Sequence, residues 1–387
     1  MATIALSGSI AQRPGRAGHT WVFLSYLLGF RSLGYEVLFI DRLTLDMVDR
    51  ADRDGRGPDW VRSSPQARWM VEMMRDAGLG GSYALLLEDG VETIGLSRRE
   101  TLERLARSSV LINFNGFLTD EELLQAAPMR VYLDIDPGFA QMWEATGLAT
   151  PFDGHDAFVT VGANVGEDWC AVPSNDRRWV ATVQPILLDR WPAVSGGEGF
   201  TSIGSWRGPF APVSHQAHTY GLRVHEFRRF ASLPERLIDT SFEIALDVDP
   251  EDGGDVELLK ENSWSLADPG EVAGDLLSYR NYIQGSMAEI AIAKSMYVET
   301  KGGWFSDRSA CYLASGKPVL AQDTGFGTLL PTGEGLLGFS DLDQAVFGAE
   351  QIFADLDRHA AAARSIAEEF FDAGKVLTVL LDRLGVG

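Results

Sequence analysis

A segment in the C-terminal half, residues 301–327, carries side chains suited to binding a diphosphate. It reads KGGWFSDRSACYLASGKPVLAQDTGFG and predicts a helix that begins at Ser306 or Asp307 and ends before Gly316. The first turn of a helix has free backbone N–H groups and the positive end of the helix dipole, which together attract an anion. Arg308 lies in that first turn, where its guanidinium would form charge-assisted hydrogen bonds to the same phosphate oxygens.

The strand predicted after this helix ends at Asp323, Thr324 and Gly325. A carboxylate and a flexible backbone would then lie at the carboxyl edge of a sheet, where α/β proteins bind their ligands. The segment is therefore predicted to bind a phosphorylated ligand. The alternative is that its polar residues only cap the helix and that its large side chains belong to the core, namely Trp304, Tyr312 and Leu313.

His19 is the candidate for acid–base chemistry in the N-terminal half. It follows Gly15 and Gly18 in a loop that leads from an expected strand, residues 3–7, into an expected helix, residues 18–32. An imidazole with a pKa of about 6.5 has a neutral form at cellular pH that can take a proton from a hydroxyl group. The alternative is a loop histidine that forms only local hydrogen bonds.

A nicotinamide site is a weaker interpretation of the same region. Asp41 ends the second expected strand, residues 36–40, as a ribose-binding carboxylate would. The preceding loop, GSIAQRPGRAG, lacks the GxGxxG pattern that such a site requires. We therefore expect no dinucleotide cofactor.

Further polar residues of the C-terminal half could add to the anion site. Arg207 follows a Gly-Ser turn in GSWRG, residues 204–208, from which its side chain would reach a cleft between the two halves. Ser286 and Lys294 precede the Gly-Trp turn and would reinforce the same site, although Lys294 is also typical of a solvated helix residue. Glu289 is expected to be a surface charge or a helix cap.

Length and composition restrict the class of protein. The chain has 387 residues, of which 45% are apolar, and this is enough for two domains of ordinary size. Its formal charge of −22 argues against a nucleic-acid partner, which would need clustered Lys and Arg. Two unrelated cysteines, an N-terminus without a charged and apolar leader, and no apolar run of membrane-spanning length predict a cytoplasmic protein without a membrane span.

Short apolar strands alternate with helices along most of the chain, which predicts an α/β fold with doubly wound parallel sheets. The apolar strands lack polar alternation, as expected for a parallel sheet covered on both faces. Between residues 181 and 199, apolar residues give way to Pro, Ser and Gly, and the alternation then resumes. We expect two Rossmann-like domains that face a cleft, residues 1–190 and 191–387, with a final helix that crosses back to the first.

The Gly-Trp turn, the helix, the sequence Ala-Ser-Gly-Lys-Pro-Val and the strand ending in Asp-Thr-Gly resemble the donor site of glycosyltransferases with the GT-B fold. The resemblance covers residues 301–339 and the two-domain layout. Arg308 is similar to an arginine of spore-coat and maturation glycosyltransferases. The resemblance implies an enzyme that moves a sugar from a nucleotide-diphosphate sugar, held mainly by the C-terminal domain, to a small-molecule or glycan acceptor.

The resemblance also implies roles for single residues. His19, preceded by Gly18 and followed by a Gly-x-x-Val sequence, resembles the histidine with which inverting members remove the acceptor proton. Where many retaining members carry two glutamates, this chain has Gly303 and Cys311. The residues expected to contact the donor ribose instead are Asp307, Asp323 or Glu299.

Two clusters have the residue types of metal ligands. Asp134 and Asp136 end an N-terminal strand in DIDPG, and we interpret them as acceptor-side or structural residues. His215, His218 and His225 have no cysteine or acidic residue at metal-site spacing. Because GT-B enzymes generally stabilise the leaving diphosphate with helix dipoles and basic side chains, we expect no metal and no cofactor besides the nucleotide-sugar substrate.

Two other functions share this predicted fold. One is a non-catalytic GT-B protein that binds a nucleotide or a partner, and the other is a nucleotide-sugar epimerase. Nucleotide binding without turnover would favour the first, and a product formed without an acceptor would favour the second. The sequence leaves open the donor, the acceptor, the stereochemistry of transfer and whether the chain forms a homodimer.

Overall fold

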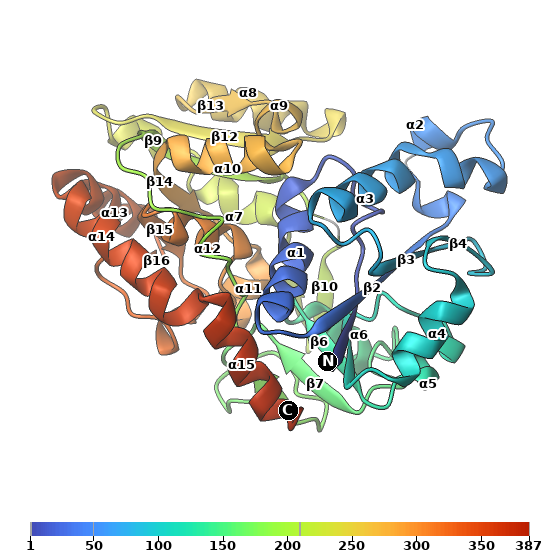
Figure 1. The fold of residues 1–387 in the computed structure, drawn as a ribbon. Helices are drawn as coiled ribbons and strands as arrows, with labels where there is room; N and C mark the ends of the chain where they lie inside the picture. Colours follow the sequence, from blue (N-terminus) through green and yellow to red (C-terminus); the bar gives the residue numbers. More distant parts are fainter. Residues whose placement is uncertain (1, 49, 209, 387) are drawn as a thin grey trace.

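The computed structural model describes residues 2–48, 50–208 and 210–386. It contains two separate sheets with parallel strands, one formed by each half of the chain, and a short antiparallel hairpin (Figure 1). The α/β class with two doubly wound sheets is confirmed.

The N-terminal sheet has eight strands in the order β4-β3-β2-β1-β5-β6-β7-β8. Neighbouring strands are parallel except β3 and β4, which are antiparallel. The central strands consist of buried, mostly apolar residues because helices cover both faces of the sheet. The strands are β1 (Thr3–Ser7), β2 (Glu36–Leu43), β3 (Tyr83–Leu87), β4 (Glu92–Gly95), β5 (Val110–Phe114), β6 (Arg130–Asp134), β7 (Ala157–Thr160) and β8 (Trp179–Ala181).

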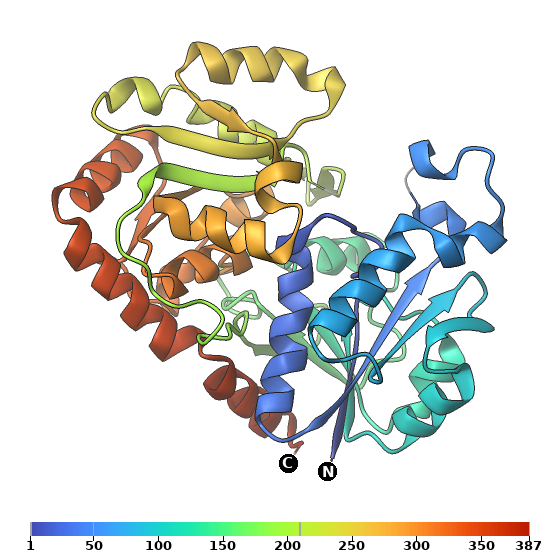
Figure 2. The ribbon, with the colours of Figure 1, turned by 45° about the horizontal axis from the view of Figure 1, so that its top comes forward.

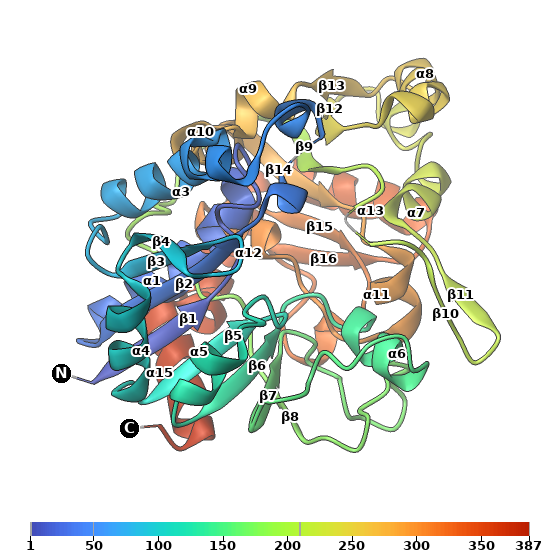
Figure 3. The ribbon, with the colours of Figure 1, turned by 90° about the vertical axis from the view of Figure 1, so that its right-hand side faces the viewer.

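The C-terminal sheet has six parallel strands in the order β13-β12-β9-β14-β15-β16. The hairpin β10–β11 extends from this half, and β10 contacts α6 (Phe139–Ala145) of the N-terminal half (Figure 3). The strands of this half are β9 (Glu198–Ser205), β10 (Val213–His215), β11 (His218–Tyr220), β12 (Phe242–Asp247), β13 (Ser265–Ala267), β14 (Ser286–Ala291), β15 (Val319–Gln322) and β16 (Leu336–Phe339).

Several helices begin with side-chain caps, such as the capping box of Ser97 and Glu100 that opens α4. Among the described residues, no helix combines the length and the apolar content needed to cross a bilayer. The helices are α1 (Ala17–Ser32), α2 (Arg50–Arg53), α3 (Pro65–Asp76), α4 (Arg98–Ala106), α5 (Glu121–Ala126), α6 (Phe139–Ala145), α7 (Arg223–Arg229), α8 (Gly253–Glu261), α9 (Pro269–Ala273), α10 (Leu276–Gly285), α11 (Ser295–Thr300), α12 (Asp307–Ala314), α13 (Leu342–Ala354), α14 (Leu356–Ile366) and α15 (Ala373–Leu384).

Helix α1 lies where the two halves meet, against α10 and α15 (Figures 1 and 2). Close packing with α15 depends on Gly29, because a Cβ atom at this position would lie 2.5 Å from Cδ1 of Leu377. The C-terminal helix therefore contacts the N-terminal half.

The segment between β8 and β9 joins the two sheets, and the expected domain boundary at residue 190 lies within it. Its backbone is fixed at Ile186, which accepts a hydrogen bond of 3.0 Å from the N–H of Ala373 and donates one of 2.7 Å to the carbonyl of Phe371. The connection is thereby held against the C-terminal helices, which restricts the relative position of the two halves.

Candidate functional site

A cavity of about 510 Å³ lies between the two halves of the chain. The N-terminal half contributes the β1–α1 loop and the segments that follow β5 and β6, and the C-terminal half contributes the end of β9 and the starts of α7 and α12. The carboxyl ends of parallel strands thus border the cavity from both sides, as in other α/β ligand sites. The residues predicted from the sequence that line it are Gly18, His19, Asp136, Lys294, Ser306, Asp307 and Arg308.

Arg308 lies in the first turn of α12 and is 8% exposed. Its Nε donates a 2.5 Å hydrogen bond to Oε1 of Glu289, and its Nη1 donates one of 2.5 Å to the carbonyl of Ile203. Glu289 is fully buried in β14, so the expectation of a surface charge or a cap was wrong. The physical reason is that β14 lies between β9 and β15, where a buried guanidinium requires a carboxylate partner.

Arg223, which sequence reasoning missed, opens α7 and also lines the cavity. Its buried Nε has no hydrogen-bond partner, and it forms no ion pair with a carboxylate, among the residues that the structure describes. Burial and, to a lesser extent, the charge of Arg308 lower the pKa of Arg223 to about 10. The side chain as a whole is partly exposed toward the cavity, but a cation with a buried, unpartnered Nε is unfavourable unless a bound anion compensates it, so this residue points to an anionic ligand.

Gly204, near the end of β9, makes room for this guanidinium. A Cβ atom at position 204 would lie 2.0 Å from Nη1 of Arg223. The sequence did contain one signal for Arg223, since a cation in the first turn of a helix opposes the helix dipole and needs another reason to be there.

Arg207 does not line the cavity, contrary to the prediction that it reaches the cleft. Its side chain is exposed, and its Nε and Nη2 donate hydrogen bonds of 2.7 and 2.8 Å to the carboxylate of Asp252. The preceding residue, Trp206, is buried and donates from Nε1 to Asp255 at 2.7 Å. Both residues follow the end of β9, and the ion pair with Asp252 holds the Arg207 side chain outside the cavity.

Lys294 is buried, so the alternative of a solvated helix residue was also wrong. Its Nζ donates to Oδ1 of Asp136 at 2.9 Å and to the hydroxyl of Tyr297 at 3.1 Å, and this hydroxyl also donates to Asp136. The ammonium lies 5.1 and 5.3 Å from the ring centres of Phe139 and Phe210. Because Asp136 follows β6, this ion pair joins the two halves across the cavity.

Ser306 and Asp307 lie at the start of α12, where a helix start was predicted. The hydroxyl of Ser306 caps no backbone N–H group, so the first turn has no side-chain cap on the side of the cavity. Burial raises the pKa of Asp307, which favours its neutral form beside an anion. Trp304 lines the cavity and stacks on Tyr297 with ring centres 4.2 Å apart.

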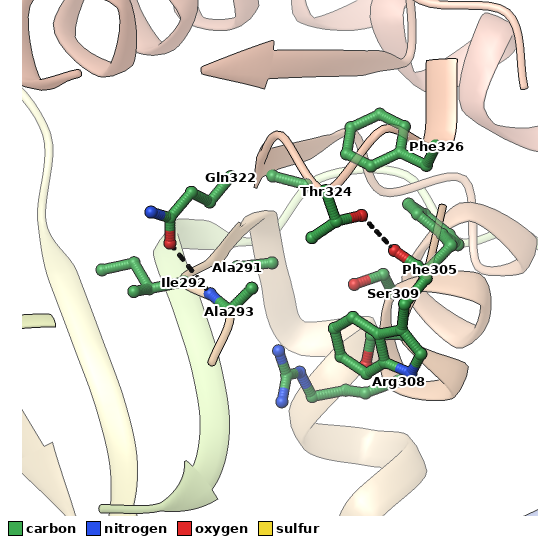
Figure 4. Close-up of a pocket in the computed structure, with 12 residues that line it drawn as sticks. Ala291, Ile292, Ala293, Phe305, Arg308, Ser309, Gln322, Thr324 and Phe326 are labelled. Carbon is green, nitrogen blue, oxygen red and sulfur yellow. Dashed lines mark hydrogen bonds between the residues drawn. The ribbon is translucent and has the colours of Figure 1, made fainter. Parts of the chain in front are cut away.

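Asp323, Thr324 and Gly325 lie beside the cavity and do not line it. Asp323 accepts 2.8 Å hydrogen bonds from Nζ of Lys301 and from the N–H of Gly325. The hydroxyl of Thr324 donates to the carbonyl of Trp304 in a small pocket shown in Figure 4. These contacts stabilise the turn between Lys301 and Trp304, and the expected donor contacts of the three residues stay predictions.

The remaining candidate residues do not line the cavity and form contacts outside it. Asp134 is buried and accepts a 2.7 Å hydrogen bond from Gln141. Ser286 is buried at the start of β14, and His218 contacts Glu299 on the outside of α11. In the described part of the chain, no three His, Cys, Asp or Glu side chains gather as metal ligands would.

His19 is in the first turn of α1 and lines the cavity. Its Nε2 lies 2.9 Å from the hydroxyl and 3.1 Å from the carbonyl oxygen of Ser9. Because a carbonyl oxygen can only accept, we infer that Nε2 carries the proton and that Nδ1 holds the lone pair. Burial and, to a lesser extent, the charge of Arg13 lower the pKa of His19 to about 4, so the ring is neutral and a weak base.

We expect His19 not to titrate between about pH 8 and about pH 5. Its pKa in the folded chain lies below that of an unfolded histidine, so its contribution to stability is complete above about pH 6.5 and is lost as the pH falls toward 4. The measurement is NMR of the six histidine rings, with His19 assigned from the spectrum of His19→Gln. If the titration midpoint of His19 lies at about pH 6.5, the ring is accessible to solvent, which would contradict its burial in the structure.

Comparison with known proteins identifies the architecture. No protein-family model and no curated protein matches the sequence. A glycosyltransferase from Rickettsia africae has a TM-score of 0.57 at 10% identity over 98% of this chain and 97% of its own. An α-glucosyltransferase in complex with UDP and a 13-mer DNA containing a HMU base has a TM-score of 0.57 at 10% identity over 99% of both chains. The chain has the GT-B fold.

A third structural match, a protein assigned as a UDP-N-acetylglucosamine 2-epimerase from Listeria monocytogenes, has a TM-score of 0.51 at 8% identity over 98% of this chain and 94% of its own. Sequence identities this low show that the proteins share a fold and nothing more. The chemistry of this GT-B protein therefore depends on the side chains that line the cavity between its two domains.

Proposed function

We propose that this GT-B protein is a glycosyltransferase that moves a sugar from a nucleotide-diphosphate sugar to a small-molecule or glycan acceptor. The observation that supports the proposal most is Arg223, a partly buried cation whose buried Nε has no partner and which has no carboxylate partner among the described residues, in a cavity between the two domains. A diphosphate supplies the missing negative charge, and the similarity in fold to glycosyltransferases supplies the reaction class.

The C-terminal domain would stabilise the departing diphosphate. Arg223 and Nη2 of Arg308, which makes no hydrogen bond to a described residue, would bind its oxygens together with the first backbone N–H groups of α12 at Ser306 and Asp307. Lys294, which also lines the cavity and is paired with Asp136, would add positive charge. These groups act where negative charge develops as the bond between the anomeric carbon and the diphosphate breaks, and the proposal needs no metal.

The acceptor hydroxyl would approach from the N-terminal domain, where His19 and Asp136 line the cavity. As the acceptor oxygen forms the new bond to the anomeric carbon, its proton must leave. In an inverting enzyme, Nδ1 of the neutral His19 would take this proton. In a retaining enzyme, an oxygen of the departing diphosphate would take it, and His19 would only accept a hydrogen bond.

The charge of the chain favours acceptors other than nucleic acid. One structural match is bound to DNA, but this chain has a net charge of −22, which repels a phosphate backbone. We therefore propose that the acceptor is small enough to enter the cavity or is the end of a glycan.

Epimerisation of a nucleotide sugar is the second candidate, because one structural match is assigned as an epimerase. It would use the same donor site without an acceptor. Analysis of the products formed from the nucleotide sugar alone separates the two activities, since a new nucleotide sugar indicates epimerisation and an intact donor is expected of a transferase. A protein that binds nucleotide and forms no product with or without acceptors would be the non-catalytic alternative.

Calorimetric titration with UDP, GDP, dTDP and NAD tests the donor site directly. We expect one nucleoside diphosphate to bind, and to bind equally well in EDTA, because the charges that hold it belong to the protein. Its affinity should fall as the salt concentration rises. If NAD alone binds, or if none of the four binds, the donor site is assigned wrongly.

A further inference from the structure

Five cationic side chains line the cavity, although the whole chain carries a charge of −22. Two of them, Arg13 and Arg223, form no ion pair with any residue that the structure describes. These two belong to opposite domains of the GT-B fold. The other three are neutralised in the pairs Arg16–Asp247, Lys294–Asp136 and Arg308–Glu289.

The loop that carries Arg13 is held in one conformation by the N-terminal sheet. Ala11 is fully buried, and its N–H donates a 2.7 Å hydrogen bond to Oδ2 of Asp41 at the end of the buried part of β2. Nε2 of Gln12 donates to the carbonyl of Arg42 at 3.1 Å. Arg13 follows these anchored residues, and its exposed side chain borders the cavity and can be reached from solvent.

The start of α1 is the second feature of this wall that attracts an anion. The helix has sixteen residues, and its N-cap residue, Arg16, makes no side-chain cap. Ala17, Gly18 and His19 form its first turn, and all three line the cavity. Uncapped N–H groups and the positive end of the α1 dipole therefore face the same space as Arg13.

The diphosphate is the anionic group that all nucleotide-diphosphate sugars share, and the proposed function places this group against Arg223 in the C-terminal domain. The anion site formed by Arg13 and the start of α1 is then left for the other substrate. We infer that the acceptor carries an anionic group, a phosphate or a carboxylate, that Arg13 binds. This inference rests on the proposed function and adds the chemical class of the acceptor.

The test uses protein saturated with the nucleoside diphosphate that it binds, so that the donor site is occupied. Inorganic phosphate, glucose 6-phosphate, glucuronate and glucose are then titrated as probes. We expect an anionic probe to bind about ten-fold or more tightly than glucose, the size of a charge-assisted contact. Phosphate and glucuronate distinguish a phosphate site from a carboxylate site.

Arg13→Gln is expected to remove the preference for anionic probes over glucose. It should change the nucleotide affinity by less than about two-fold, because Arg13 lies outside the proposed donor site. The matched control is Arg178→Gln, because Arg178 is also an exposed arginine but does not line the cavity. Equal binding of all four probes, or a preference that persists in Arg13→Gln, overturns the inference while nucleotide binding still supports the donor site. A large loss of nucleotide affinity in Arg13→Gln overturns it as well, by placing Arg13 in the donor site.

Discussion

Arg223→Gln should lose most of its affinity for the nucleoside diphosphate and unfold at a temperature no lower than that of the unchanged protein. The affinity falls because the guanidinium supplies charge-assisted hydrogen bonds, and we expect a loss of about thirty-fold or more, or about 2 kcal/mol. The stability is kept because the substitution removes a partly buried cation that has an unpartnered Nε and no carboxylate partner among the described residues. Calorimetric titration and thermal unfolding without ligand measure the two effects separately.

Arg207→Gln is the matched control for this prediction, since Arg207 belongs to the same domain but is exposed and bound to Asp252. It should change the affinity little, and its exposed ion pair contributes about 1 kcal/mol or less to stability. If Arg223→Gln binds the nucleotide normally and unfolds at a lower temperature, Arg223 has a structural role and the main support for the donor site is lost.

Gly204→Ala tests the position of the guanidinium without removing it. The new methyl group would lie 2.0 Å from Nη1 of Arg223, and the flexible end of this side chain can move away without disturbing the backbone. We expect weaker nucleotide binding in Gly204→Ala and no further loss when the same change is made in Arg223→Gln. Additive losses would mean that Gly204 acts on the ligand by another route.

The sequence predicts the first βαβ unit well because every signal in it is local. The expected strand at residues 3–7 is β1, and the expected helix at residues 18–32 differs from α1 only by beginning one residue later. The same holds for α12, which lies between the serine and the glycine that marked its ends in the sequence, although the Ser306 hydroxyl makes no cap. Apolar runs and helix ends suffice for these elements because they depend on neighbours in sequence.

The candidate site was predicted less well because its side chains depend on contacts distant in sequence. Glu289 looks like a surface residue until β14 is placed between two strands and opposite Arg308. Arg207 was predicted as an anion ligand and Arg223 was missed, yet Arg207 is paired with Asp252 outside the cavity and Arg223 lines it. A linear pattern contains the residue types of such a site, whereas the partner of each charge is set by the tertiary fold.

Breaking the ion pair between Glu289 and Arg308 is expected to have the largest effect on stability. Either Glu289→Met or Arg308→Met leaves the other charge buried without its partner, which lowers the free energy of unfolding by about 3 to 5 kcal/mol. Oε2 of Glu289 has no hydrogen-bond partner among the described residues, so the pair is only partly compensated even when intact. Replacing both residues by methionine removes both charges and keeps apolar volume, and this double variant should be more stable than either single variant.

Urea unfolding of the three variants and of the unchanged protein measures these differences, and nucleotide titration of the double variant separates stability from binding. If the pair matters only to the fold, the double variant should bind the nucleotide normally. We expect it to fold and to bind poorly, because Arg308 lines the cavity and its remaining guanidinium nitrogen faces the ligand in the proposed arrangement. Destabilisation of the double variant by the full sum of the single effects would show that the two charges do not compensate each other.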